Sequence, residues 1–103
     1  MSSVILDYDR RVPEIMRKAM EGFAKQEGRA IVMILAEKGE LSFKQLAKFI
    51  SMNPGTLNYH LKLLLNAGLL ANHYKKVEST DEYSFYQLTE FGNDFLKLLG
   101  IMK

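Results

Sequence analysis

The strongest constraint on the fold of this chain is a pair of short helical segments separated by a break of three residues. Ser42 is suited to cap the first helix, because its hydroxyl can accept a hydrogen bond from a backbone N–H group of the first turn. Asn53 can cap the second helix in the same way, with Pro54 in the first turn and Gly68 just beyond the end. The apolar residues of the second helix share one face: Leu57, Leu61, Leu64 and Leu65. Two capped helices joined by a tight turn predict a helix-turn-helix unit at residues 42–67.

The segments on either side of this unit predict two helices before it, and a hairpin and a helix after it. Residues 12–27 carry apolar side chains at three- and four-residue steps, and Gly28 separates them from a more apolar helix that ends at Gly39. Residues 69–88 contain two strand-like stretches around a turn-like run, which predicts a β-hairpin. Residues 89–99 predict a C-terminal amphipathic helix. We therefore expect a mostly α protein with a small β-hairpin, of the α+β class.

The length and composition of the chain restrict its function. With 103 residues, of which 48% are hydrophobic, it is too short for two separate cores, so we expect a single domain over residues 1–103. It has no cysteine, which excludes disulfide bonds, thiolate metal sites and cysteine nucleophiles. The sequence contains no catalytic nucleophile paired with a general base, no glycine-rich phosphate loop and no spacing typical of metal ligands. We therefore expect that the protein is not an enzyme and binds no cofactor or metal. The lack of a signal sequence or a long apolar run predicts a cytoplasmic protein without a membrane span.

The charges are distributed unevenly along the chain. The formal net charge is only +2, but residues 41–76 contain five lysines and no acidic residue. Residues 1–40 are neutral overall, and residues 77–103 carry a net charge of −3. A segment without carboxylates can approach a polyanion without repulsion between like charges, so this third of the chain is the candidate nucleic-acid surface.

Several short motifs occur in order along the second half of the chain. They are Leu46-Ala47, the run Asn-Pro-Gly-Thr-Leu-Asn-Tyr-His-Leu-Lys-Leu-Leu at 53–64, Ala-Gly-Leu-Leu at 67–70, Tyr-Gln-Leu-Thr at 86–89, and Gly92. This string resembles the ArsR-like branch of winged helix-turn-helix transcriptional regulators over about residues 29–99. The resemblance implies a winged helix-turn-helix with extra N- and C-terminal helices, in which residues 69–88 form the wing. It also implies a homodimeric, sequence-specific regulator of transcription that places one recognition helix per subunit in the major groove of double-stranded DNA. Such a protein would be associated with the nucleoid when it is bound to DNA.

The predicted DNA contacts lie on the side of the second helix that faces away from its apolar stripe. Thr56 could bind a phosphate or touch a thymine methyl group, and Asn58 could pair with adenine through two hydrogen bonds. Tyr59 could contact a phosphate or a base edge, and Lys62 could reach guanine or a phosphate. The complete set of predicted DNA-binding residues is Lys44, Lys48, Gly55, Thr56, Asn58, Tyr59, Lys62, Lys75 and Lys76. Lys44 and Lys48 suit the helix that crosses the DNA backbone, and Lys75 and Lys76 lie at the base of the wing.

Two apolar stripes near the chain ends predict a dimer interface, because so small a core can hardly cover both of them. The predicted interface consists of Val12, Ile15, Met16, Ala19, Met20 and Phe23 in the helix at 12–27, together with Phe91, Phe95, Leu98 and Leu99 in the C-terminal helix. Ile101 and Met102 could extend it. The alternative is that both stripes fold back onto their own subunit.

Two features depart from the ArsR-like pattern. The wing tip is acidic, with Glu78, Asp81 and Glu82 where such regulators commonly carry basic residues. There is no compact set of metal ligands, so metal sensing is disfavoured, and we interpret His60 and His73 as helix and strand residues rather than ligands. The sequence indicates no effector ligand. A second hypothesis is a winged-helix module that binds proteins in a transcription or chromatin assembly, but such a module has no electrostatic need for an acid-free segment.

Overall fold

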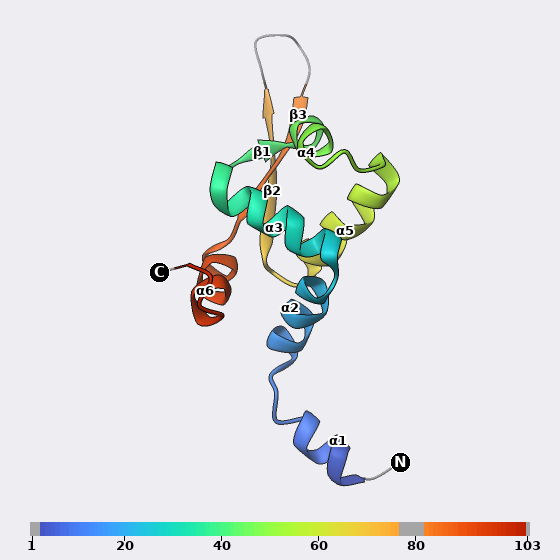
Figure 1. Ribbon diagram of the computed structural model, residues 1–103, viewed down its shortest axis with the longest axis vertical. Coiled ribbons are helices and arrows are strands. Elements are labelled where there is room, and N and C mark those ends of the chain that lie inside the picture. The colour runs from blue at the N-terminus through green and yellow to red at the C-terminus, as the bar shows by residue number, and fades with distance from the viewer. Residues whose placement is uncertain (1–2, 77–81, 103) are drawn as a thin grey trace.

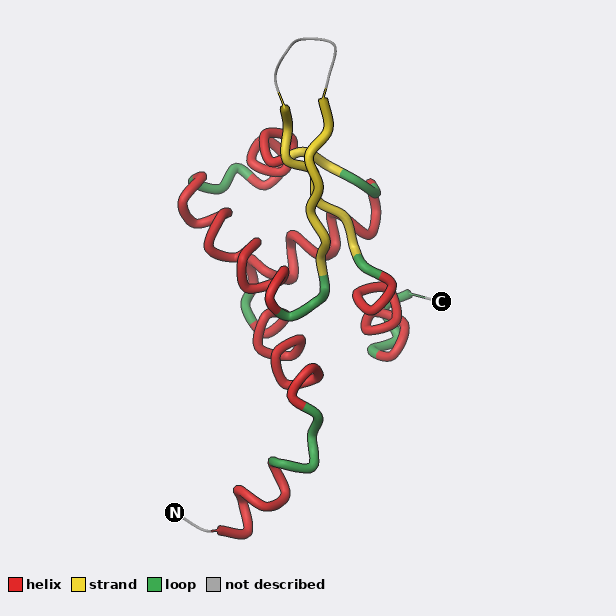
Figure 2. The backbone as a smooth tube through the Cα atoms, turned by 180° about the vertical axis from the view of Figure 1, so that it is seen from behind, coloured by secondary structure: helices red, strands yellow, loops and turns green. Residues whose placement is uncertain are grey.

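The computed structural model describes residues 3–76 and 82–102 and places a group of helices against one side of a small antiparallel sheet (Figure 1). The described helices are α1 (Ser3–Asp9), α2 (Glu14–Ala24), α3 (Gln26–Lys38), α4 (Phe43–Ile50), α5 (Pro54–Asn66) and α6 (Glu90–Leu98). The described strands are β1 (Leu41–Ser42), β2 (Leu70–Lys76) and β3 (Glu82–Leu88). Seen from behind, in Figure 2, the sheet crosses in front of the helices, and α1 extends away from them. The predicted winged helix-turn-helix fold is confirmed.

The sheet has the strand order β1-β3-β2, with both pairs antiparallel. The predicted hairpin corresponds to β2 and β3, in which His73 pairs with Phe85 and Leu70 with Leu88. The short strand β1 adds a third member through the pair Leu41 and Tyr86, and the sequence analysis did not anticipate it. Because side chains alternate along a strand, Leu41, Leu70 and Tyr86 lie on the same face of the sheet, and all three are buried in the core.

Helix α3 lies at the centre of the core, as expected from its apolar sequence. Its residues Ile31, Val32 and Leu35 are at most 2% exposed, and α2, α4, α5 and β3 all contact this helix. Fully buried leucines complete the core from the neighbouring elements: Leu46 of α4, Leu57, Leu61 and Leu64 of α5, Leu69 before β2, and Leu96 of α6. The helix-turn-helix is therefore fixed to the rest of the molecule through the buried faces of both of its helices.

The boundary between the first two predicted helices was placed wrongly. The chain is interrupted at Lys25, which is extended, and not at Gly28, which lies inside α3. Gly28 is buried because α2 passes directly over it: a Cβ atom there would lie 2.3 Å from the backbone oxygen of Gly22. The glycine thus permits close helix packing and does not break the helix.

The end of α5 and the start of α6 are joined by hydrogen bonds through Thr89. Its hydroxyl donates to the backbone oxygen of Gly68 at 2.6 Å and accepts from the N–H group of Gly92 at 2.9 Å. The N–H group of Thr89 donates to the oxygen of Leu69 at 3.0 Å. Thr89, the N-cap of α6, is therefore also a direct link to the residues that follow α5.

The predicted dimer interface is only partly available at the surface. Ala19 and Phe95 are 0% and 3% exposed, and the ring of Phe95 packs edge-on against Phe23 at 5.7 Å between centroids. Ala19 and Phe95 thus belong to the chain's own core, which leaves little of either side chain for contact with a second subunit. Met16, Phe23 and Phe91 are partly buried against that core. The remaining predicted residues stay exposed: Val12, Ile15, Met20, Leu98 and Leu99.

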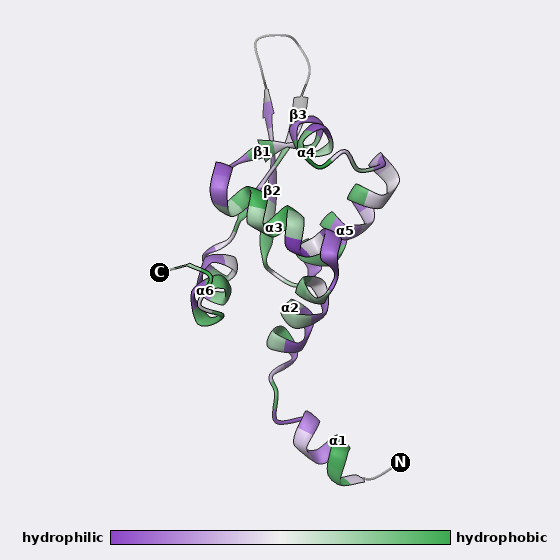
Figure 3. Ribbon diagram, viewed as in Figure 1, coloured by the Kyte–Doolittle hydropathy of each residue, from purple (hydrophilic) through white to green (hydrophobic). Residues whose placement is uncertain are grey.

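Helix α1 was not anticipated, because the first helix predicted from the sequence begins at residue 12. It contains no buried residue and extends away from the body, with α2 as its neighbour along the chain (Figure 1). Figure 3 shows that its first part is strongly apolar. Its exposed apolar residues are Val4, Ile5, Leu6 and Tyr8. Across the described part of the chain, no helix combines the length and apolar character needed to cross a membrane.

Candidate nucleic-acid interface

Helix α5 divides cleanly into a buried and an exposed face. Leu57, Leu61 and Leu64 face the core, and the residues predicted to contact DNA, from Gly55 and Thr56 onward, are exposed. The predicted contact residues on this helix, all of them exposed, are Gly55, Thr56, Asn58, Tyr59 and Lys62. These side chains belong to one face that carries no acidic residue, so a polyanion can approach it without repulsion.

The start of α5 is fixed by its cap. The side-chain oxygen of Asn53 accepts hydrogen bonds from the N–H groups of Gly55 at 2.8 Å and Thr56 at 3.4 Å. Pro54 occupies the first turn, where a missing N–H group costs nothing. The preceding Ser51 has a φ of 55°, a left-handed conformation that turns the chain from α4 into α5. These local interactions orient the N-terminal part of α5, which carries Thr56, Asn58 and Tyr59.

Helix α4 presents its lysines to solvent. Lys44 and Lys48 are exposed and four residues apart, and Leu46 between them is buried. The helix begins with a capping box in which the N–H group of Gln45 donates to the hydroxyl of Ser42 at 3.1 Å, and the N–H group of Ser42 donates to the Gln45 side chain at 2.8 Å. The lysine pair is therefore held on a well-anchored helix beside α5.

The base of the wing differs from the expectation of two lysines turned toward phosphate. The ammonium group of Lys75 is paired with the carboxylate of Glu40, which lies in the turn between α3 and β1. Glu40 also binds His73, whose Nε2 is 2.7 Å from Oε2 of the carboxylate. The side chain of Lys76 and the predicted acidic tip, Glu78, Asp81 and the Glu82 side chain, lie outside the described residues. Lys75 thus has a partner that is 35 residues away in the sequence.

Lys75 and His73 both affect the ionisation of Glu40. The hydrogen bond from the Lys75 ammonium group is the largest cause that holds the pKa of Glu40 below its ordinary value; burial opposes it, and the charge of Lys75 and then the contact with His73 lower the pKa further. Glu40 is therefore ionised at neutral pH. The sequence analysis missed this cluster because Glu40 falls just outside the acid-free segment and no local pattern pairs it with β2.

His60 is enclosed next to the exposed face of α5. It is 5% exposed, its Nε2 lies 3.8 Å from Oε2 of Glu27, and its ring meets the edge of Tyr59 at 5.1 Å. Both histidines thus have acidic partners in space that their sequence neighbours do not reveal. Within residues 3–76 and 82–102 there is no group of three or more histidine, aspartate or glutamate side chains that could hold a metal ion.

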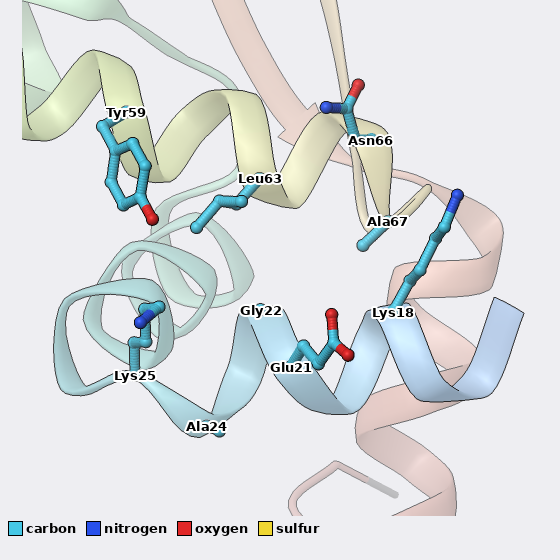
Figure 4. A pocket seen from close by; sticks show the side chains of 9 residues that line it. All are labelled: Lys18, Glu21, Gly22, Ala24, Lys25, Tyr59, Leu63, Asn66 and Ala67. Carbon is cyan, nitrogen blue, oxygen red and sulfur yellow. The ribbon is translucent and has the colours of Figure 1, made fainter. Parts of the chain in front are cut away.

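A groove of about 650 Å³ runs between α5 and α2. In Figure 4, Tyr59 and Leu63 reach down from α5, and Glu21 rises from α2 opposite them. Lys25, at the α2–α3 junction, lines the same groove and adds a cation beside Tyr59. Sequence reasoning missed Lys25 because only the packing of α2 against α5 brings it to this face.

Comparisons with known proteins agree with this geometry. The family model described as bacterial regulatory protein, ArsR family, matches residues 29–72, which include α4 and α5. The uncharacterized protein MJ0944 of Methanocaldococcus jannaschii is 31% identical over 80 residues, covering 78% of this chain and 67% of that protein.

Two solved structures show the same fold. The diamide-treated YodB of B. subtilis superposes with a TM-score of 0.72 at 21% identity, over 86% of each chain. The homodimeric winged helix-turn-helix DNA-binding domain of Mb0332 from Mycobacterium bovis has a TM-score of 0.69 at 21% identity, over 96% of this chain and 81% of that one. The family model and these structures together identify residues 29–72 as an ArsR-family segment within a winged helix-turn-helix fold.

Proposed function

We propose that this protein binds specific sequences in double-stranded DNA as a homodimer and regulates transcription. The observation that carries the proposal is the exposed face of α5, which bears Asn58, Tyr59 and Lys62, contains no acid and begins at a fixed cap. An α-helix fits the major groove, where amide, hydroxyl and ammonium groups can distinguish base pairs. In this arrangement α5 is the recognition helix.

The two helices of the helix-turn-helix divide the contacts between phosphates and bases. Lys44 and Lys48 of α4 bind phosphates and set the position of the protein on the duplex. Asn58 and Tyr59 read base edges, with Thr56 and Lys62 contacting bases or phosphates. Gly55 has no side chain, so the backbone of α5 can approach the groove closely at this position.

The homodimer is supported by the apolar surface that the chain leaves uncovered near its ends. Ile15 and Met20 of α2 are 53% and 55% exposed, and Leu98 of α6 is 71% exposed. Helix α1 adds further exposed apolar side chains, so the uncovered surface is larger than the sequence indicated. Surfaces of this kind on small proteins mark contacts with a partner. The related fold of Mb0332 is described as homodimeric, which supports the same assembly here.

Binding to duplex DNA should depend steeply on salt. If the dimer neutralises four to nine phosphates, the logarithm of the association constant falls against the logarithm of salt concentration with a slope of about −4 to −8. Fluorescence anisotropy of a labelled duplex of about 30 base pairs, selected from random DNA, gives this slope, since such a duplex holds two half-sites one helical turn apart. No complex at low salt would contradict the proposal, and binding of a protein partner with a flat salt response would favour the interaction module instead.

Single substitutions should separate phosphate contacts from base contacts. We expect Lys44→Ala to weaken binding to selected and random duplexes by a similar factor, because a phosphate contact carries no sequence information. Asn58→Ala should weaken binding to the selected site by about 5- to 100-fold, with little effect on random DNA, because it removes a base contact. Equal losses on both duplexes for both variants would contradict the assignment of Asn58.

A further inference from the structure

In the cluster around Glu40, the two oxygens of one carboxylate bind two side chains of the wing, a lysine and a histidine. Oε1 binds the ammonium group of Lys75, and Oε2 binds Nε2 of His73 at 2.7 Å. The Glu40 side chain is 24% exposed, less than that of Lys75 at 52%. The acid is therefore partly enclosed by its partners, and the lysine is drawn onto it from strand β2.

The register of the sheet explains why these groups meet. His73 and Lys75 are two residues apart on β2, so their side chains leave the same face of the strand. Phe85 of β3 pairs with His73 and supports both: its ring stacks on the His73 ring at 6.1 Å between centroids, and the Lys75 ammonium group lies 5.2 Å from the ring centre. The core residue Tyr86 leaves the opposite face of the sheet. Lys75 is thus held on the face of the sheet opposite to Tyr86 by an anion and an aromatic ring together.

A phosphate of the DNA backbone would compete with this carboxylate for the same ammonium group. Both are anionic oxygen acceptors, and a lysine is a point charge that binds either one. The contacts with Lys75 and His73 lower the pKa of Glu40, so its carboxylate is ionised at neutral pH and remains an effective competitor. Two such carboxylates would be present in a homodimer.

We propose that Glu40 is a built-in competitor of DNA phosphate, which withholds Lys75 from the duplex and thereby limits the affinity of the wing for DNA. This inference rests on the proposed DNA binding. It assigns a negative role to an acidic residue outside the recognition helix. In the resting protein the wing carries less available positive charge than its sequence suggests, and tighter binding requires that Lys75 leave the carboxylate.

The test compares Glu40→Gln with wild-type protein on the same duplex. The amide keeps the size of the side chain but removes the charge that holds Lys75. We expect Glu40→Gln to raise the affinity at low salt by about tenfold and to make the salt slope steeper by about 2, one extra phosphate contact for each subunit. Glu37→Gln is the matched control, since it removes the same charge from an exposed position of α3 that is three residues away.

A second lysine variant shows whether the effect passes through Lys75. Lys75→Gln alone should change wild-type affinity less than twofold, and in the Glu40→Gln background it should abolish the gain, which is a double-mutant coupling between the two residues. The single Lys75→Gln result also tests the inference if Glu40→Gln fails to fold. An unchanged or lower affinity for folded Glu40→Gln, an equal gain for Glu37→Gln, or a large loss for Lys75→Gln alone would overturn it. If wild-type protein bound no DNA, the proposed function would fail, and the inference would fail with it.

Discussion

Replacing Gly28 with alanine is expected to lower the free energy of unfolding by about 3 kcal/mol, because inserting an atom into a closely packed contact forces the backbone to move. The new Cβ atom would lie 2.3 Å from the backbone oxygen of Gly22 and near the side chain of Leu64. Neither α2 nor α3 can shift alone, since both pack against α5. Urea denaturation followed by circular dichroism measures the change.

Gly55→Ala is the matched control for this substitution. Gly55 is also in a helix, but it is exposed, and its Cβ position meets only the side chain of Asn53 at 3.2 Å. We expect its stability to stay within about 1 kcal/mol of wild type, because alanine is the better helix former. A Gly28→Ala variant as stable as the control would mean that α2 does not pack against α3 as closely as described.

The second large effect is expected from Ile15→Glu, which should convert the proposed homodimer into a monomer. An exposed position tolerates a charge in the monomer, but a carboxylate buried in an apolar interface without a partner costs several kcal/mol. Analytical ultracentrifugation should show half the mass. The affinity for a duplex with two half-sites should fall by about 100-fold or more, because each monomer then binds one half-site alone.

Tyr74→Glu serves as the control for assembly. Tyr74 is 69% exposed, but it lies on β2 and not on α1, α2 or α6. This variant should keep the mass of the dimer. A dimeric Ile15→Glu protein would place the interface elsewhere, and a wild-type monomer would mean that both apolar stripes serve only their own subunit.

The sequence was most informative where local interactions decide the structure. The caps at Ser42 and Asn53 and the left-handed turn at Gly68 depend on residues that are close together in the chain, so the bounds of α4 and α5 could be predicted closely. The same spacing identified which side of α5 is buried. The exposed residues proposed to contact DNA follow from that side, although their individual contacts remain predictions.

The sequence was least informative where packing between segments far apart in the chain decides the structure. Gly28 looked like a helix break, but its role is to admit the backbone of α2. Phe95 looked available to a partner, but Phe23 covers it within the same chain. Lys75 looked like a phosphate contact, and only the folded sheet shows that Glu40 holds it. In each case the decisive neighbour is separated in sequence and has no local signature.

The hydroxyl of Thr89 has a mechanical consequence for the assembled protein. It links Gly68, two residues beyond the end of α5, to the beginning of α6. The outer residues of α6 are among those that we assign to the subunit contact. A rotation of one subunit relative to the other would therefore be transmitted through Thr89 to the C-terminal end of the recognition helix α5. The rigidity of this hydrogen-bonded link would determine the distance between the two copies of α5 in the dimer. That distance in turn determines which half-site spacing the dimer accepts.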